Sequence, residues 1–396
     1  MNALINLTTF IFSPFLGFII SLYNKRSIIS DFIFLAFFFL IGCSFSFQSM
    51  EADSYRYALD FSNMSQYDNE DIILTRLLQG KIDLYDYIIP YIVIHFTKSP
   101  RILFGVYAVI FGYFVLKFYH LINDDWKKKK NIYVWIIIIV IFMLNPYMNI
   151  NGVRYWTASW CFFTSFIAYF LYHNKIWLTG LLLTPIIHIS FLIPLFFVLL
   201  TVISKQTFNY NQLYYITIIT FIIGILLPLD KIISILPAEF GIFDHFEAYI
   251  DEGYISENTN LSNKRNIIFI LICKLPYLFV FNFLYTVRKL KLKLDNEDLV
   301  LFYFVYLLLS FLFIFERIPS VARMYYISYM LLIYLTFRIY KRFHLLSIKK
   351  MILFIPVFFL GSIYDVITIH NLVLSNLYFN KPIWNILEYA LSLKNL

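Results

Sequence analysis

Long apolar stretches alternate with short polar segments along almost the whole chain. At least nine of these stretches reach or approach the ~20 apolar residues with which an α-helix spans a bilayer. The pattern predicts an all-α, polytopic membrane protein, a single transmembrane domain over residues 1–396 with about 10 transmembrane helices. We expect these helices at residues 2–22, 32–48, 102–122, 131–149, 154–172, 212–236, 266–286, 299–316, 323–341 and 351–373.

Two apolar stretches do not fit simple crossings. Residues 84–97 are too few for a full span, and residues 176–203 include Pro185, His188 and Pro194. A proline removes a backbone donor and usually kinks a helix. Irregular backbone at membrane depth is tolerated only where protein or water covers the freed polar groups. We therefore expect one or two short or re-entrant helices; the alternative is that one of the crossings above is misplaced.

Composition excludes a soluble globular chain, because 61% of the residues are hydrophobic and only 14% are charged. The formal net charge is +8, but the basic residues gather in short loops. Loops placed in the cytoplasm by the positive-inside rule hold 17 of the 32 Lys and Arg, so the charge indicates topology rather than a nucleic-acid surface. These loops are residues 23–31, 123–130, 173–175, 203–211, 287–298 and 338–350.

Two longer loops are acidic instead. Residues 49–86 carry eight acids against three bases, and residues 237–265 carry six acids against two bases. The alternation of spans places both loops, and both termini, on the external side. The chain start resembles a first membrane helix rather than a cleaved signal, since it lacks a basic region and an A-x-A site.

The three cysteines, Cys43, Cys161 and Cys273, each stand alone in an apolar stretch. No spacing typical of a metal site occurs, and no common hydrolase, zinc-peptidase or P-loop motif is present. We therefore expect no metal and no cofactor.

Charged residues inside or beside membrane spans are candidates for function, because they are costly there. Arg154 and Arg323 each stand at the external start of a span, and Lys274, Asp365 and His188 lie within apolar stretches. Each also has a purely structural alternative: the cations can extend to lipid headgroups, the aspartate can pair with a cation, and the histidine can be a core residue.

The acidic loop 49–86 opens with carboxylates and aromatic rings two to four residues apart, including Asp53, Tyr55 and Tyr57. Aromatic faces suit sugar rings, and carboxylates suit sugar hydroxyls. The alternative is an ordinary amphipathic helix at the membrane surface.

Five motifs occur in order through most of the chain: Asp53-Ser-Tyr55-Arg-Tyr57, Asp83-Leu-Tyr85-Asp86-Tyr87, Asn151-Gly152-Val153-Arg154, His188-Ile189-Ser190 and Arg323-Met-Tyr325-Tyr326. They resemble the motifs of the EpsG-like branch of the Wzy oligosaccharide repeat-unit polymerases. Thr157 departs from the family pattern, in which a different small residue is expected at this position.

The resemblance implies a GT-C-like membrane glycosyltransferase on the external face of the bacterial cytoplasmic membrane. Its donor would be a growing glycan on undecaprenyl diphosphate, and its acceptor a single lipid-linked repeat unit. The product would be O-antigen, capsule or exopolysaccharide. Besides these substrates and the bilayer, expected partners are a chain-length regulator and a flippase. No nucleotide sugar, metal or nucleic acid is implied.

For such an enzyme, Arg154 and Arg323 would bind the leaving diphosphate, with Lys274 or Arg265 assisting, because arginine grips phosphate bidentately. The first candidate for the base is Asp53 and the second is His188. The expected substrate-binding residues are Tyr55, Tyr57, Asn151, Gly152, Arg265, Lys274 and Tyr326.

Two rival functions share parts of this pattern. A ligase that transfers finished glycan would share the arginines and the topology, but such ligases have their largest outer loop late in the chain. A flippase or transporter would show two related halves and charges along the middle of several spans, and the sequence shows neither.

Overall fold

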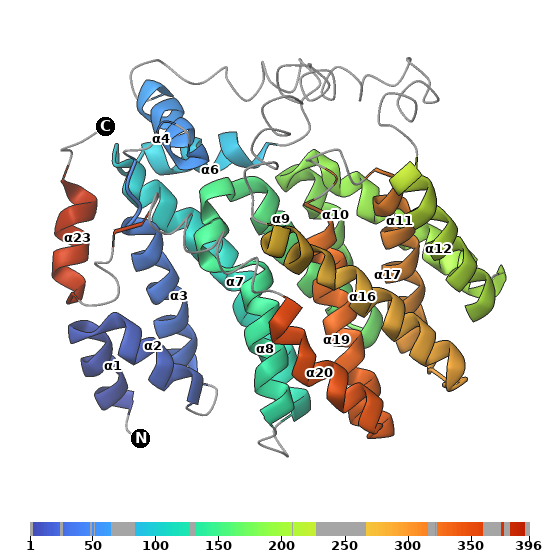
Figure 1. The fold of residues 1–396 in the computed structure, drawn as a ribbon. Helices are drawn as coiled ribbons and strands as arrows, with labels where there is room; N and C mark the ends of the chain where they lie inside the picture. Colours follow the sequence, from blue (N-terminus) through green and yellow to red (C-terminus); the bar gives the residue numbers. More distant parts are fainter. Residues whose placement is uncertain are drawn as a thin grey trace. The chain divides into compact units, whose positions relative to one another are not determined.

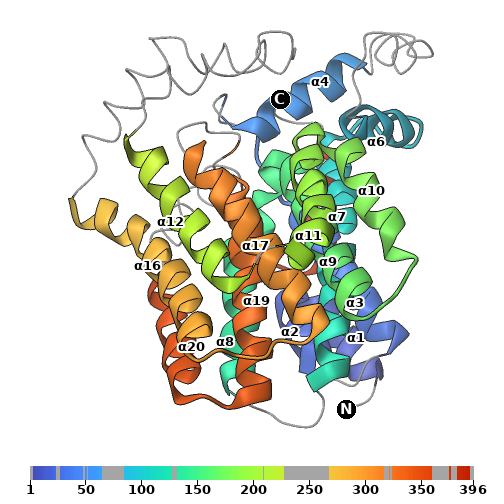
Figure 2. The same ribbon diagram turned by 90° about the vertical axis from the view of Figure 1, so that its right-hand side faces the viewer.

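The computed structural model describes residues 3–23, 27–47, 50, 52–64, 84–126, 132–207, 209–226, 267–315, 321, 323–358, 374–375 and 381–392. Within them the regular elements are helices, with one isolated bridge between Phe45 and Leu374, so the all-α prediction is confirmed for the described part. The chain divides into two compact units, which Figure 1 and Figure 2 show from two sides. Unit 1 comprises Met1–Lys130, Asn145–Leu192 and Tyr364–Leu396, and unit 2 comprises Asn131–Leu144 and Ile193–Ile363.

Unit 1 is built around the long helix α7. Helix α3 lies along it, α9 packs against both α7 and α10, and the short helices α4 and α6 also contact α7 (Figure 1). The elements of unit 1 are α1 (Ala3–Phe12), α2 (Pro14–Tyr23), α3 (Ile28–Cys43), α4 (Asp53–Met64), α6 (Tyr85–Ile94), α7 (Pro100–Trp126), η1 (Tyr147–Gly152), α9 (Val153–Phe166), η2 (Ile167–Leu171), α10 (Trp177–Ile187), η3 (Ile189–Phe191) and α23 (Ile383–Leu391).

The contact between α3 and α7 depends on a small residue. A Cβ atom at Gly42 would lie 2.2 Å from the carbonyl oxygen of Phe104, which is closer than any real contact. Glycine therefore lets the two backbones approach, as small residues do between membrane helices. At the other end of α3, the Ser27 hydroxyl accepts a hydrogen bond from the backbone N–H of Ser30 and caps the helix.

The N-terminal stretch differs from its prediction as one span over residues 2–22. It forms two ten-residue helices, α1 and α2, that meet at Ser13 and Pro14 and pack against each other. A Cβ atom at Gly17 would lie 2.5 Å from Cα of Phe10, so this glycine is needed for the close packing. Neither helix alone reaches the length of a membrane span.

Unit 2 is a bundle in which α17 contacts α12 and α19, while α8 packs against α19 and α20 (Figure 2). A Cβ atom at Gly224 of α12 would lie 1.8 Å from the carbonyl oxygen of Phe313 of α17, so this pair also requires glycine. The elements of unit 2 are α8 (Ile132–Leu144), α11 (Leu192–Thr207, from its second residue), α12 (Tyr210–Leu226), α16 (Ile267–Lys289), α17 (Asn296–Ile314), α19 (Tyr325–Phe343) and α20 (Leu346–Phe358).

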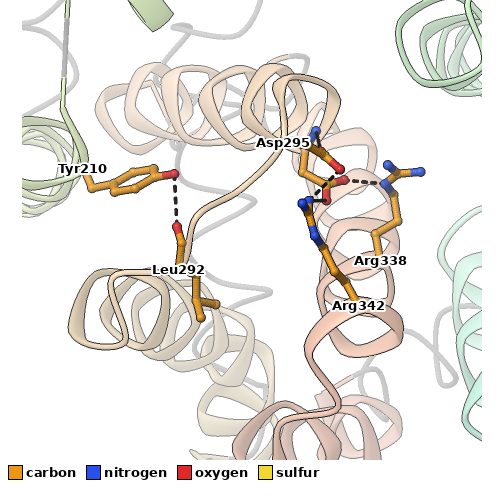
Figure 3. Close-up of polar contacts among 6 residues, drawn as sticks. Tyr210, Leu292, Asp295, Arg338 and Arg342 are labelled. Atoms are coloured by element: carbon orange, nitrogen blue, oxygen red, sulfur yellow. Dashed lines mark hydrogen bonds and ion pairs between the residues drawn. The ribbon is translucent and has the colours of Figure 1, made fainter.

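The first turn of α17 holds an ionic cluster (Figure 3). Asp295 caps the helix by accepting a hydrogen bond of 2.9 Å from the backbone N–H of Asp298. Arg338 of α19 pairs with Asp298, and Arg342 Nη1 lies 2.6 Å from Asp295 Oδ2. The cluster joins α17 to the last turns of α19 through charged groups of both signs.

Three stretches of the described residues are long and apolar enough to cross a membrane by length and composition: Pro100–Ile122, Trp135–Leu171 and Asn296–Ile314. The second includes α8 and α9, separated by η1. Many large apolar side chains are exposed, which is typical of a lipid-facing surface. They include Leu182, Leu183, Phe196, Leu199, Ile203, Ile219, Ile222 and Leu226. The chain is a helical membrane protein, while its count of about ten spans and its single-domain organisation stay predictions.

Both stretches that did not fit simple crossings contain short helices. Residues 84–97 contain the ten-residue helix α6, and residues 176–203 are broken at His188, where the backbone is extended (φ −154°, ψ 120°) between α10 and η3. The predicted break is confirmed, and re-entry of either stretch stays a prediction. The two loops predicted to be external fall largely outside the described residues: most of 49–86 and all of 237–265.

Candidate functional site

Two motifs that are distant in sequence meet at the first turn of α4. The side-chain oxygen Oδ1 of Asn151, in η1, accepts a hydrogen bond of 2.8 Å from the backbone N–H of Ser54. The first N–H groups of a helix have no partner within it, so Asn151 satisfies one of them. This bond joins the start of the acidic, aromatic segment to the turn that precedes α9.

Arg154 lies at the centre of the site. It is the second residue of α9, and its Nε donates a hydrogen bond of 3.1 Å to the hydroxyl of Tyr57 on α4. Its Nη1 lies 3.3 Å from Oδ2 of Asp86 on α6. The guanidinium is thereby held between two helices, while 26% of the Arg154 side chain stays exposed against 11% for Asp86.

The electrostatics of this position favour an anion. A helix N-terminus carries about half a positive charge, so a cation there is disfavoured unless negative groups surround it. Asp86 offsets the charge of Arg154, and Asp53 opens the neighbouring helix α4. Arginine and the helix N-terminus together attract phosphate or carboxylate groups from the exposed side.

Asp86 is the residue that sequence reasoning missed. It occurs in one of the motifs quoted for the resemblance, but no role was assigned to it. The helix that carries it is tied to α10, because the backbone N–H of Leu84 donates to the carbonyl oxygen of Ile186 at 3.0 Å. A carboxylate in the first turn of a short apolar helix is the signal that marks it in the sequence.

Asp53 is available to solvent at the edge of the site. Its Oδ1 accepts a hydrogen bond of 2.9 Å from Arg56 Nη2, and 40% of the side chain is exposed. Its Oδ2 would lie 3.6 Å from a Cβ atom placed at Gly152, while the ring of Trp156 would lie at 3.1 Å. Gly152 therefore gives room to the side chains of Trp156 and Asp53 at this point, and its role in substrate binding stays a prediction.

The two tyrosines of α4 differ in their surroundings. Burial raises the pKa of Tyr57, while the charge of Arg154 and its hydrogen bond oppose this rise, so the phenol stays protonated at neutral pH. Tyr55 is partly exposed, and no hydrogen bond or ring contact joins it to the site among the described residues. Tyr57 thus supports Arg154, whereas a role for Tyr55 in sugar contact stays a prediction.

His188 lies beside α9 but is engaged elsewhere. Its ring packs edge-on against Tyr155, the residue after Arg154, with ring centroids 5.4 Å apart. Its Nδ1 accepts a hydrogen bond of 3.3 Å from the backbone N–H of Ser190 and lies 2.8 Å from the Ser190 hydroxyl. In the neutral ring the proton is then on Nε2, which leaves His188 less suited to act as a base than Asp53.

The predicted site residues of unit 2 are described only in part. Arg323 is exposed in the turn before α19, and its carbonyl oxygen accepts a hydrogen bond of 3.2 Å from the backbone N–H of Tyr326. The backbone of Lys274 lies in α16, but its side chain, together with Arg265 and Asp365, lies outside the described residues. Convergence of Arg323 with Arg154 stays a prediction, because the two belong to different units.

Within the described part of the chain, no three His, Cys, Asp or Glu side chains gather as a metal site would require. The expectation of a metal-independent reaction is not tested by this observation.

Figure 2 shows α4 and α6, which carry Tyr57 and Asp86, near one end of α7. The described site is therefore a cation at a helix N-terminus, held by a phenol and a carboxylate.

Comparison with known proteins places the chain in a family. No curated protein and no solved structure matches it. The family model described as EpsG family matches residues 4–381, which is nearly the whole chain. This match confirms the resemblance that the ordered motifs indicated. The chain therefore belongs to the EpsG family.

Proposed function

We propose that the protein is a glycosyltransferase that polymerises undecaprenyl-diphosphate-linked repeat units into O-antigen, capsule or exopolysaccharide. Membership of the EpsG family supports a membrane polymerase, and the apolar helices support a location in the bacterial cytoplasmic membrane. The observation that carries the proposal is Arg154, a partly exposed cation at a helix N-terminus that is oriented by Tyr57 and Asp86. Such a group suits the diphosphate of a lipid carrier.

The proposed reaction uses two lipid-linked glycans. A hydroxyl at the non-reducing end of the acceptor repeat unit forms a bond to the anomeric carbon of the donor glycan. The bond from that carbon to the diphosphate oxygen breaks, and undecaprenyl diphosphate leaves with the electron pair. The proton of the attacking hydroxyl goes to a carboxylate, for which Asp53 is the first candidate because it is more exposed than Asp86.

Arg154 contributes most where negative charge develops. As the diphosphate leaves, its oxygens gain charge, and a guanidinium fixed in advance stabilises them without reorganisation. Tyr57 and Asp86 supply this fixed orientation. In the proposal Arg323 is the second arginine that binds the diphosphate, with Lys274 or Arg265 assisting.

The test is the glycan made by a strain that lacks the gene. We expect its surface glycan to collapse from a ladder to single repeat units, and expression of the intact chain should restore the ladder. Complete polymer retained on the lipid carrier would instead indicate a ligase. Loss of every surface repeat unit would indicate a flippase, and either result would overturn the proposal.

Orientation is tested separately with reporter fusions. The proposal requires the acidic loops outside and the basic loops inside. Fusions at Lys129 and Lys291 should report the cytoplasm, and fusions at Asn69 and Glu252 should report the exterior. A cytoplasmic signal at Asn69 would place α4 and its carboxylates on the wrong side for this reaction.

A further inference from the structure

Asp86 differs from the other acids of the site in its burial and in its partner. It keeps 11% of its side chain exposed and lies 3.3 Å from Arg154, whereas Asp53 is 40% exposed and pairs with Arg56. Asp86 is therefore the negative group that directly balances the cation assigned to the diphosphate.

The surroundings of Asp86 strengthen this pairing. The preceding residue, Tyr85, is buried against Tyr107 of α7, with ring centroids 5.4 Å apart. Tyr107 is fully buried and lies within electrostatic range of both Asp86 and Arg154. Charges interact more strongly where aromatic rings replace water, so Asp86 exerts more influence on Arg154 than an exposed acid would.

Asp86 is also fixed in space by its own helix. At the start of α6, the backbone N–H of Leu84 donates a hydrogen bond to the carbonyl oxygen of Ile186 in α10, and α6 packs on α7 and α9. Arg154 extends from α9, so the carboxylate and the guanidinium are presented by separate, mutually packed helices. Two rigid elements thus determine where the guanidinium stands before any substrate arrives.

We propose that Asp86 is a positioning residue: it holds the Arg154 guanidinium as its counter-ion, and the donor diphosphate replaces it as partner during the reaction. This inference rests on the proposed function, which assigns Arg154 to the diphosphate. It has two consequences of opposite kind. Removing the carboxylate charge loosens the guanidinium and slows catalysis. The same change removes a negative neighbour that repels the diphosphate and so tightens binding.

The first experiment measures kinetics with repeat units linked to undecaprenyl diphosphate and purified protein. Asp86→Asn should lower kcat on the order of tenfold or more, because misplacing a catalytic group has effects of this size. It should lower KM for the lipid-linked substrate as well. Asp86→Glu, which keeps the charge, should recover part of kcat. A rise in KM with unchanged kcat would overturn the inference.

The second experiment asks whether Asp86 acts through Arg154. Residues that work as one unit show non-additive effects. In the Arg154→Lys background, Asp86→Asn should therefore cause almost no further fall in kcat. Asp60→Asn is the matched control, since Asp60 is an exposed acid of α4 whose removal changes the net charge equally. If the fold-change in kcat of the double variant equals the product of those of Asp86→Asn and Arg154→Lys, Asp86 acts independently of Arg154.

The third experiment does not need polymerisation. Inorganic diphosphate is added to purified protein, and its dissociation constant is measured from the shift in thermal unfolding. We expect Asp86→Asn to bind diphosphate on the order of tenfold more tightly than the unchanged protein, and Arg154→Lys to bind it more weakly. Equal affinity in all three proteins would refute the counter-ion role. Tighter binding together with no polymerase activity in the unchanged protein would refute the proposed function alone.

Discussion

Two aspartate–arginine pairs of this protein show how the same residue types serve different ends. In unit 2, Asp298 is only 2% exposed, pairs with Arg338 and lies 3.8 Å from Arg342. Figure 3 shows the capping residue Asp295 beside Arg338 and Arg342. In unit 1, Asp86 pairs with Arg154 at 3.3 Å, and the arginine keeps 26% of its side chain exposed. The first cluster has two acids for two bases and joins α17 to the last turns of α19, whereas the second places a partly exposed cation at the start of α9.

The two pairs differ in where the arginine stands on its helix rather than in its exposure. Arg154 is the second residue of α9 and is 26% exposed, whereas Arg342, in the last turn of α19, is 43% exposed. A buried charge whose partner is removed destabilises a protein strongly. A partly exposed cation at a helix N-terminus attracts an anion, whereas a cation in the last turn of a helix already interacts favourably with the helix dipole. Stability should therefore respond to changes in the α17–α19 cluster, and activity to changes around Arg154.

The largest effect is expected from Arg338→Leu. It leaves Asp298 buried with Arg342 as its more distant cation, so we expect a loss of roughly 3 kcal/mol in the free energy of unfolding. Thermal unfolding in detergent measures this loss. The double variant Asp298→Asn with Arg338→Leu should recover much of it, because no unpaired charge remains. An unchanged unfolding midpoint in Arg338→Leu would contradict the structural role of the cluster.

Arg154→Lys should instead spare folding and remove activity. Lysine keeps the charge but lacks the planar fork that binds phosphate and Tyr57 together. We expect a fall in polymerisation rate on the order of a hundredfold or more, measured as chain length in cells with normal membrane levels of the protein. Arg323→Lys should behave in the same way if both arginines bind the diphosphate. If either lysine variant polymerises at close to the normal rate, the arginine at that position serves only as an anchor to lipid headgroups.

Tyr57→Phe tests the support of Arg154 with a smaller change. It removes the hydroxyl that accepts the hydrogen bond from Nε while keeping the ring. A hydrogen bond to a charged group contributes about 1.5–3 kcal/mol, so the rate should fall roughly tenfold or somewhat more. Tyr55→Phe is the control on the same helix: it keeps the aromatic face predicted for sugar contact and removes only a hydroxyl that makes no hydrogen bond to the site among the described residues, so it should change the rate much less. Equal polymerisation rates for both variants and the unchanged protein would show that the Tyr57 hydroxyl does not contribute to the reaction.

The smallest effect concerns Asp295 and pH. Its pKa lies below the ordinary value for an aspartate: partial burial would raise it, but the hydrogen bond from the Asp298 backbone and the charge of Arg342 outweigh the effect of burial. A lowered pKa in the folded state stabilises the protein above the unfolded pKa, and this contribution is lost as pH falls through the folded value. Asp295→Asn keeps the helix cap and removes the charge. Its unfolding midpoint should be slightly below that of the unchanged protein at pH 7 and equal to it once pH falls below the folded pKa. A constant difference across this range would exclude the ionic contribution.

Local patterns explain much of what sequence reasoning predicted correctly. The apolar stretches that became α3, α7, α12, α16, α17 and α19 are marked by composition alone. Prolines at positions 185 and 194 flank the break at His188, and the extended backbone there is a local consequence of that segment. The N-terminal stretch failed as a single span because Pro14 and the close packing at Gly17 favour two short helices, which hydropathy does not distinguish.

The membrane character, the helical class, the family motifs and the cation at the start of α9 all follow from the amino-acid sequence alone. Which residues surround that cation depends on how the helices pack. Tyr57 and Arg154 are 97 residues apart, as are Ser54 and Asn151, and neither pairing follows from any spacing along the chain. Asp86 became part of the site because α6 packs on α7 and α9. Hydropathy depends on each residue in turn, whereas a site depends on contacts between helices, and these arise only when the helices pack.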